Sequence, residues 1–303
     1  MAKAWRVEGL TRATPVDEAA EAILRVKLGE LRHHAALAVK RVDIEDLHAT
    51  RVASRRLRAA LGLVGGPLAD LEPGVRRLGT ALGQVRDCDV TIEWLERMLV
   101  KSLDVERPGI ERLLAARRAE LPALEQLARE ALTAFEAHVA LPIELRIEEA
   151  GWPGSLDGKR VRGRLTERME VVARRIARLE ERGLGDTLTA HALRIAGKKA
   201  RYDLELVEDI FPEAREALVR LKQLQELVGE LHDADVHLAF LPAYVASVEL
   251  GEQAGAVRLL RDALRAREKY ELLLVEELDA WRGGALARAL GAAIGDGRGV
   301  GRS

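Results

Sequence analysis

The chain has 303 residues, 48% of them hydrophobic, which is enough to build the core of one large or two ordinary domains. Its 48 basic residues nearly cancel its 49 acidic ones, which excludes a global basic field that would attract nucleic acid or membranes without selection. The single Cys88 excludes an internal disulfide, the first residues have no apolar signal-peptide core, and no apolar stretch reaches membrane-span length. We therefore expect a cytoplasmic protein in which any anion site arises from local segregation of charge.

Amphipathic helices are predicted along the chain, since apolar residues recur at spacings of three and four in segments such as 19–42 and 113–139. Turn signals separate about eight such helices; they lie at 65–67, 72–74, 107–109, 183–185, 211–212 and 241–242. Glycines and a proline cluster at 151–158, where the helical period stops. The sequence thus predicts an all-α fold with a first half over 15–150, a second half over 159–282 and a flexible tail over 283–303.

Two sequence blocks occur twice, in the same order. HATRVASRRLR at 48–58 matches HALRIAGKKAR at 191–201, with the histidine, both outer arginines and the alanine at position six identical. LGQVRDCDV at 82–90 matches VGELHDADV at 228–236, at an offset that differs by only three residues. Self-similarity of this kind indicates an internal duplication.

The first block places its basic residues on one side of a helix and its apolar residues on the other, because the basic positions fall within a sector of about 80°. This basic stripe consists of His48, Arg51, Arg55 and Arg58 in the first half and His191, Arg194, Lys198 and Arg201 in the second, with Arg56 and Lys199 on the flank. The carboxylate partners that usually neutralise such a stripe are absent, since no Asp or Glu occurs from Leu47 through Ala69 or from Ala190 through Tyr202. Like charges at helical spacings repel, and an external anion would relieve that repulsion. The alternative is an ordinary solvated helix face.

Other residues of the repeat are open to two interpretations. Arg76 and Lys222 occupy equivalent positions on the helices that lead into the second block, and they either reach the same anion or are surface charges. The histidines either contact the anion, gaining charge as the pH falls, or make a structural hydrogen bond. Gly197 is expected to permit close approach of backbone or ligand. One aspartate of each pair is expected to brace basic side chains or cap a helix, with metal binding as the lesser alternative; the pairs are Asp87 with Asp89 and Asp233 with Asp235.

The motifs HATRVASRRLRAAL, HALRIAGKKARYDLEL, LGQVRDCDV and VGELHDADV resemble those of the CHAD domain, the conserved histidine alpha-helical domain, from about Pro15 to Arg282. The resemblance implies two four-helix bundles related by a pseudo-twofold axis, with a basic central groove or pore that holds inorganic polyphosphate. It implies no catalysis, cofactor or metal, and it suggests association with polyphosphate granules. The contacts it implies are His48, Arg51, Arg55, Arg56, Arg58, Arg76, His191, Arg194, Lys198, Lys199, Arg201 and Lys222. Because Arg86 stands where the second half has His232, the halves need not grip the ligand equally.

Three other functions compete with polyphosphate binding. The adjacent His232 and Asp233 suggest a metal-dependent phosphohydrolase, although the first half has Arg86 in place of the histidine. Arginines directed at phosphate also suit RNA or DNA, although few aromatic residues are present for base stacking. A helical scaffold for an acidic protein segment is the third alternative.

Overall fold

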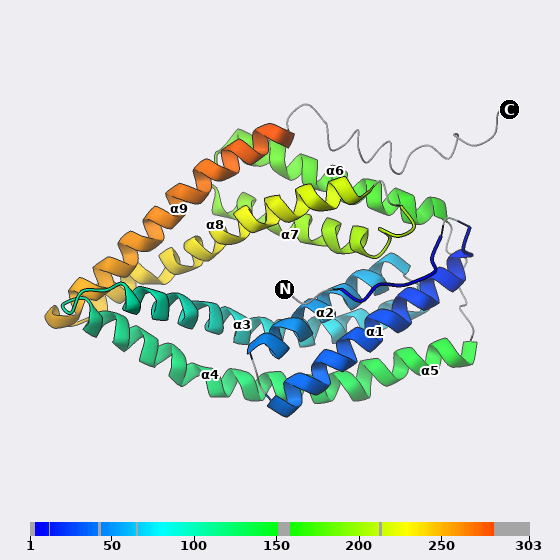
Figure 1. The fold of residues 1–303 in the computed structure, drawn as a ribbon, viewed down its shortest axis with the longest axis horizontal. Coiled ribbons are helices and arrows are strands. Elements are labelled where there is room, and N and C mark those ends of the chain that lie inside the picture. Colours follow the sequence, from blue (N-terminus) through cyan, green and yellow to red (C-terminus); the bar gives the residue numbers. More distant parts are fainter. Residues whose placement is uncertain are drawn as a thin grey trace. The chain divides into compact units, whose positions relative to one another are not determined.

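A computed structural model describes residues 4–11, 13–41, 44–64, 66–150, 158–211 and 214–281. Every regular element in these ranges is a helix (Figure 1), which confirms the predicted all-α class. The predicted break between the halves, apart from Gly158, and the predicted tail over 283–303 lie outside the described residues. Within the described part, none of the helices combines the length and low polarity needed to span a lipid bilayer.

The helices are labelled as in Figure 1. In chain order they are α1 (Val16–Arg41), α2 (Ile44–Val64), the 3-10 helix η1 (Gly66–Leu71), α3 (Glu72–Val100), α4 (Arg107–Phe135), the π-helical turn η2 (Glu136–Ala140), α5 (Leu141–Ala150), α6 (Gly158–Arg182), α7 (Thr187–Glu205), α8 (Arg215–Ser247), the 3-10 helix η4 (Leu250–Glu252) and α9 (Gln253–Trp281).

Most turn signals coincide with helix boundaries. The helix α3 begins at Glu72, α4 begins at Arg107, and the glycines at 183 and 185 lie between α6 and α7. The turn predicted at 241–242 is wrong, because α8 continues through Pro242 to Ser247. A proline inside a helix removes one hydrogen bond and can bend the helix without ending it.

Contacts divide the chain into two compact units. Unit 1 comprises Met1–Thr91, Arg118–Arg164 and Tyr202–Pro212, and unit 2 comprises Ile92–Arg117, Leu165–Arg201 and Glu213–Ser303. The helices α3, α4, α6 and α7 each contribute residues to both units. The units are therefore divided differently from the predicted halves, 15–150 and 159–282.

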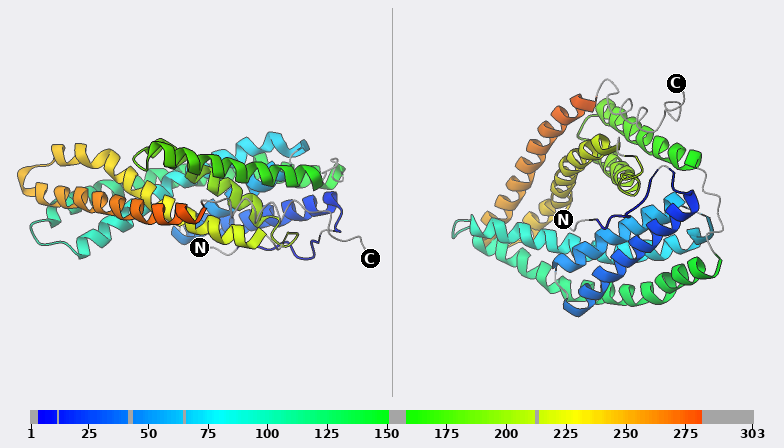
Figure 2. Two further views of the ribbon diagram at one scale, coloured as in Figure 1. Left: turned by 90° about the horizontal axis from the view of Figure 1, so that it is seen from above. Right: turned by 45° about the vertical axis from the view of Figure 1, so that its right-hand side comes forward.

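Aliphatic side chains form the core of unit 1, as expected for a chain with so few aromatic residues. The helix α1 packs along α2 (Figures 1 and 2). The largest fully buried side chains of this unit are Leu24, Leu31, Leu57, Leu61, Leu68, Leu78, Leu82 and Ile143. Burial of one such side chain contributes about 1.5–3 kcal/mol. Cys88 is also buried.

Unit 2 has an aliphatic core supplemented by one aromatic stack. The helix α9 packs along α8 (Figure 2), and Leu95, Ile110 and Leu179 are fully buried. Trp94 stacks on the buried His237, with ring centroids 4.0 Å apart. The indole Nε1 of Trp94 donates a hydrogen bond of 3.1 Å to Asp262, so α3, α8 and α9 are tied together within this unit.

The helices α4 and α9 meet through two glycines of unit 2 whose contacts are reciprocal. A Cβ atom added to Gly109 would overlap the carbonyl oxygen of Glu252, and one added to Gly255 would overlap the carbonyl oxygen of Glu106. Each added atom would also lie 2.9 Å from a backbone nitrogen of the opposite helix. The backbones therefore approach so closely that only glycine fits on either side.

The charged residues around this crossing are reciprocal as well. Glu106 and Glu252 each accept a hydrogen bond from the backbone nitrogen three residues earlier, which stabilises the start of α4 and of η4. Arg112 pairs with Glu252 at 2.6 Å, and Arg258 lies 3.9 Å from Glu106. Glu106, Gly109 and Arg112 correspond in sequence to Glu252, Gly255 and Arg258. Their spacing is the same as that between the two copies of the second repeated block, 82–90 and 228–236.

Candidate anion-binding site

The first basic stripe lies on α2, with its apolar side buried as the spacing predicts. Ala53, Leu57, Ala60 and Leu61 are at most 1% exposed. His48, Arg51, Arg55 and Arg58 are all partly exposed, on the same helix. The amphipathic division predicted for this segment is therefore present in unit 1.

The stripe on α2 faces the second block on α3, and the two helices run antiparallel there. Arg86 of α3 acts electrostatically on His48. One turn further along α2, the Arg51 guanidinium lies 3.6 Å from Asp87 and against Gly83. Another turn on, the Ser54 hydroxyl oxygen lies 3.4 Å from the position of a Cβ on Gly79. Positions that ascend along α2 thus contact positions that descend along α3.

The second stripe lies on α7 and meets the second block on α8 in the same register, within unit 2. The rings of His191 and His232 have centroids 5.0 Å apart. Further along α7, a Cβ on Gly197 would lie 3.6 Å from the Gln225 side chain. His191 stands opposite His232 as His48 stands opposite Arg86, and Gly197 stands opposite Gln225 as Ser54 stands opposite Gly79.

In the pairs Ser54–Gly79 and Gly197–Gln225, the glycine lies on the partner helix in one half and on the stripe helix in the other. In unit 1 the stripe helix carries a serine and the partner helix a glycine, Gly79. In unit 2 the stripe helix carries Gly197 and the partner helix the larger Gln225. The close approach expected at Gly197 is thus made by a side chain of α8 at an ordinary van der Waals distance. Gln225 is buried, and its Nε2 has no hydrogen-bond partner within the described chain.

Sequence reasoning missed Gln225 as a residue of this surface. Its signal was present in the repeat, because Gln225 and Gly79 are related by the offset of the second block. Gln225, Gly229 and His232 also share one face of α8 with Lys222, by their helical spacing. Continuing the antiparallel register by one turn brings Lys222 to the level of Arg201 on α7, and Arg76 to the level of Arg58 on α2.

The histidines of the site are held in their neutral form. Burial, followed by the positive charges of Arg86 and Arg51, lowers the pKa of His48. Burial, followed by Arg194 and Lys198, lowers the pKa of His191. The Nδ1 of His48 is buried and makes no hydrogen bond within the described residues.

Arg56 differs from the other predicted contacts because it belongs to a buried charge cluster of Lys27, Glu30, Arg56 and Glu205. Its Nη1 donates a hydrogen bond of 2.6 Å to Glu30, and its Nε lies 3.5 Å from Glu205. Lys27 lies 3.2 Å from Glu30 and also donates a hydrogen bond to the carbonyl oxygen of Trp5. Arg56 is 6% exposed, so its guanidinium supports α2 from within unit 1.

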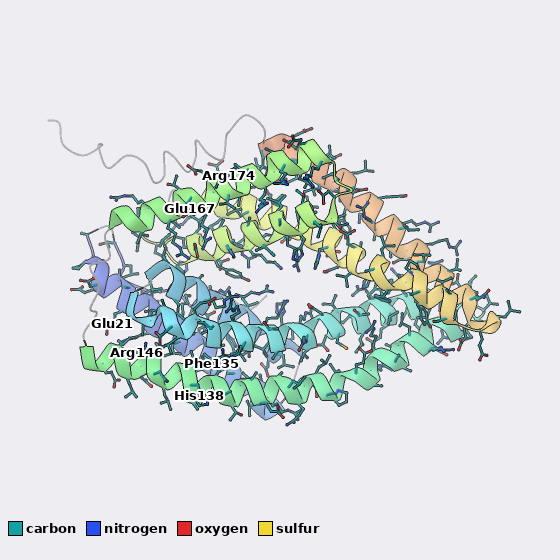
Figure 3. All side chains as sticks on the ribbon, turned by 180° about the vertical axis from the view of Figure 1, so that it is seen from behind. Glu21, Phe135, His138, Arg146, Glu167 and Arg174 are labelled. Carbon is teal, nitrogen blue, oxygen red and sulfur yellow. The ribbon has the colours of Figure 1, made fainter. Side chains whose placement is uncertain are left out.

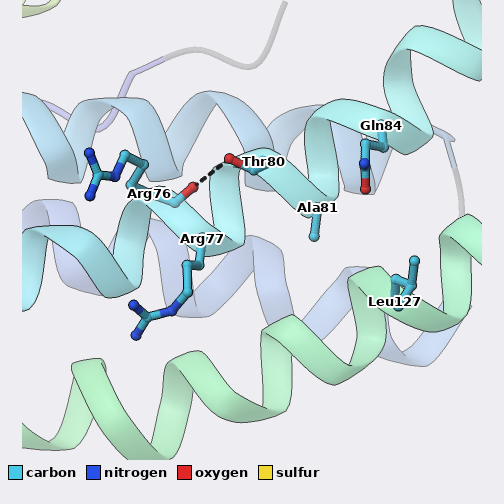
Figure 4. Close-up of a pocket in the computed structure, with 6 residues that line it drawn as sticks. All are labelled: Arg76, Arg77, Thr80, Ala81, Gln84 and Leu127. Atoms are coloured by element: carbon cyan, nitrogen blue, oxygen red, sulfur yellow. Dashed lines mark hydrogen bonds between the residues drawn. The ribbon is translucent and has the colours of Figure 1, made fainter.

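The remaining predicted contacts lie at different depths. Arg58 pairs with Glu72 at 2.6 Å but keeps 36% of its side chain exposed, and Arg201 is buried at 9% exposure. Arg194 and Lys198 are partly exposed, while Lys199 and Lys222 are exposed. Arg76 lines an open pocket of about 360 Å³ together with Arg77 and Thr80, and Figure 4 shows the two guanidinium groups turned away from each other.

The aspartates of the second block brace basic side chains, in a different way in each half. Asp87 lies beside Arg51 of the stripe, whereas Asp235 accepts a hydrogen bond of 2.8 Å from Arg267 of α9. Both blocks lie in the middle of long helices, so the expected alternative of a helix cap is not realised. Among the described residues no cluster of three or more His, Cys, Asp or Glu side chains has the arrangement of a metal site.

Comparison with known proteins places this geometry in context. The family model for the CHAD domain matches residues 22–242. The crystal structure of the CHAD domain from the plant Ricinus communis is similar at a TM-score of 0.65 and 26% sequence identity, over 97% of each chain. PptA from Streptomyces chartreusis is similar at a TM-score of 0.61 and 16% identity, over 88% of this chain and 100% of that one, which shows a shared fold alone. A search of curated proteins finds no match.

Proposed function

Since this chain belongs to the CHAD domain family, we propose that it binds inorganic polyphosphate, without catalysing its breakdown, through the basic stripes of α2 and α7. The observation that carries the proposal is the repetition of one arrangement in both units. In each, a histidine-led basic stripe on one helix meets a further basic or titratable residue on an antiparallel partner, Arg86 in unit 1 and His232 in unit 2.

The chemistry of these stripes suits a chain of phosphates. Arginine can grip two phosphate oxygens with its planar fork, and lysine supplies a compact charge. We assign direct contacts to the partly or fully exposed members of the stripes, to the buried Arg201, and to Arg76 and Lys222, and we assign a supporting role to Arg56 within the buried charge cluster. The direct contacts are His48, Arg51, Arg55, Arg58, Arg76, His191, Arg194, Lys198, Lys199, Arg201 and Lys222.

We also propose that the two halves arose by duplication and are related by a pseudo-twofold axis. The reciprocal contacts of Gly109 with Glu252 and of Gly255 with Glu106 support this, since exchanging the two helices reproduces the same set of neighbours. The antiparallel stripe contacts repeat in the same way. Such a protein would be expected in the cytoplasm, on polyphosphate granules.

A titration with long-chain polyphosphate tests the proposal. Binding is expected to weaken with salt, since each phosphate neutralised on a dense polyanion releases counterions and contributes about 0.9 to the slope of log affinity against log salt concentration, by analogy with DNA. Replacing both Arg51→Ala and Arg194→Ala is expected to lower the affinity and reduce that slope by about 2. A matched control is Arg174→Ala, an exposed residue of α6 (Figure 3) whose only described ion pair is with Glu170.

Two results would contradict the proposal. Equal affinity in the double variant and the Arg174→Ala control would mean that the stripes are not the site. Release of phosphate from long-chain polyphosphate with Mg²⁺ or Mn²⁺, lost in His232→Ala, would identify a phosphohydrolase instead. Competition with RNA and DNA at physiological salt distinguishes a preference for nucleic acid from one for polyphosphate.

A further inference from the structure

The histidine pair of unit 2 includes a residue, His232, that the proposed contacts leave unused. His191 of α7 and His232 of α8 lie with ring centroids 5.0 Å apart and planes inclined by 44°. Neither imidazole forms a hydrogen bond or ion pair with a carboxylate within the described chain. Two imidazoles thus lie next to each other, beside the permanent cations Arg194 and Lys198.

The charges acting on this pair all have the same sign. Burial, followed by Arg194, His191 and Lys198, lowers the pKa of His232 to about 4. At neutral pH the free protein therefore leaves both rings uncharged, because adding a proton would place a further cation beside Arg194 and Lys198.

Several titratable groups of α8 and α9 are engaged with each other. Arg267 of α9 lies 2.8 Å from Asp235 and 2.8 Å from Glu271. Tyr270 of α9 is hydrogen-bonded to Glu230 of α8. No carboxylate of the described chain, Asp233 included, is among the groups that shift the pKa of either histidine, so the field at His191 and His232 comes from the cations of α7 and from the rings themselves.

We propose that the His191–His232 pair takes up protons when a polyanion binds to the α7 stripe, so that this stripe binds phosphate chains more tightly as the pH falls. The proposal rests on the proposed function and names His232 as an additional binding residue. A phosphate chain held by Arg194 and Lys198 brings a row of negative charges to the pair and reverses the sign of the local potential. Protonated imidazoles then become both donors and counter-charges for the phosphate oxygens.

The equivalent place in unit 1 has a different chemistry. Arg86 stands where unit 2 has His232, and arginine stays charged at every pH of interest. The α2 stripe therefore has a single histidine, His48, beside a permanent cation. Proton uptake on binding is consequently concentrated in the α7 stripe, and the duplicated halves differ in their response to pH.

Titration calorimetry in two buffers with different heats of ionisation measures this uptake directly. The probe is long-chain polyphosphate, in which the weakly acidic terminal groups are a small fraction. The wild-type protein is expected to take up protons on binding at about pH 6, with little uptake at about pH 8. Its affinity for polyphosphate is expected to rise by up to tenfold for each pH unit by which the pH falls, per proton taken up.

Reciprocal exchanges between the halves sharpen the test. His232→Arg copies unit 1 into unit 2 and is expected to remove most of the uptake, while His232→Gln removes the titratable ring without adding charge and is expected to do the same. Arg86→His copies unit 2 into unit 1 and is expected to increase the uptake. His138→Gln, at an exposed histidine of η2 (Figure 3), is the control and should match the wild type.

The outcomes separate this inference from the proposed function. Polyphosphate binding with no proton uptake at either pH, or uptake that persists undiminished in both His232 variants, would overturn the inference and leave polyphosphate binding standing. Absence of any polyphosphate binding at either pH would instead overturn the proposed function, and the inference with it.

Discussion

Replacing Glu30 with glutamine tests whether the buried charge cluster holds α2 in place. Glu30 is fully buried and contacts both Arg56, at 2.6 Å, and Lys27, at 3.2 Å. Without its charge, the two buried cations Lys27 and Arg56 would lose the carboxylate that contacts both of them, while Arg56 would keep Glu205. Removing one member of a buried ion pair typically costs about 3–5 kcal/mol, because the remaining charge stays desolvated without compensation. Glutamine can still accept a hydrogen bond, so we expect a loss near 3 kcal/mol in the free energy of unfolding.

The same helix supplies a matched control. Glu21 of α1 (Figure 3) pairs with Arg25 at 2.7 Å, but both side chains are more than a third exposed. An exposed pair of this kind contributes about 0–1 kcal/mol, so Glu21→Gln is expected to change stability little. Urea denaturation followed by circular dichroism at constant pH and salt measures both variants.

A second substitution distinguishes lost charge balance from poor packing. Adding Lys27→Met to Glu30→Gln leaves Arg56 opposite Glu205, one cation against one anion, and is expected to recover most of the lost stability. The reasoning would be refuted if Glu30→Gln and Glu21→Gln unfolded at the same urea concentration. It would also be refuted if the double variant were less stable than Glu30→Gln alone.

Two further predictions concern the packing of unit 2. Gly109→Ala and Gly255→Ala are each expected to lower the melting temperature sharply, since a Cβ at either site overlaps the opposite backbone. The control is Gly163→Ala, at a helical glycine with open space around it, which is expected to stabilise the protein by about 0.5–1 kcal/mol. Equal melting temperatures for all three variants would contradict the close crossing of α4 and α9. Burial lowers the pKa of His237 to about 4, below its ordinary value of 6.5, so the stability that this residue contributes is present above about pH 6.5 and is lost as the pH falls toward 4. Between about pH 6.5 and pH 5 the wild type is therefore expected to lose roughly 2 kcal/mol more in unfolding free energy than His237→Phe, and parallel pH profiles of the two proteins would contradict the assignment.

Helix positions and the basic stripes were predictable from the sequence because both depend on local periodicity. Apolar residues at spacings of three and four gave the buried side of α2, and the prolines and glycines at 72–74 and 107–109 coincide with the starts of α3 and α4. Pro242 misled the same reasoning, since a proline marks a turn only where no surrounding structure holds the helix together.

Helical periodicity could not predict which carboxylates pair with the arginines of α2. Because no acidic residue lies from Leu47 through Ala69, the sequence suggested that the cations of this stripe had no carboxylate partners, yet Arg58 pairs with Glu72, and Arg56 pairs with Glu30 and Glu205. Glu205 is far from Arg56 in the chain, and no spacing rule connects residues on separate helices. The angular position of Arg56 on the helix likewise does not tell whether its side chain lies on the surface or is buried.

The amino-acid sequence therefore determined which side of each repeated helix is basic, because the angle between residues on a helix depends only on their spacing. It also contained the two repeated blocks, which are a property of residue order. The burial of Arg56, the pairing of His191 with His232 and the reciprocal crossing at Gly109 and Gly255 depended on how separate helices pack within their units. Those contacts join residues far apart in the chain, and their energies come from desolvation and close approach, which arise only once the helices are brought together.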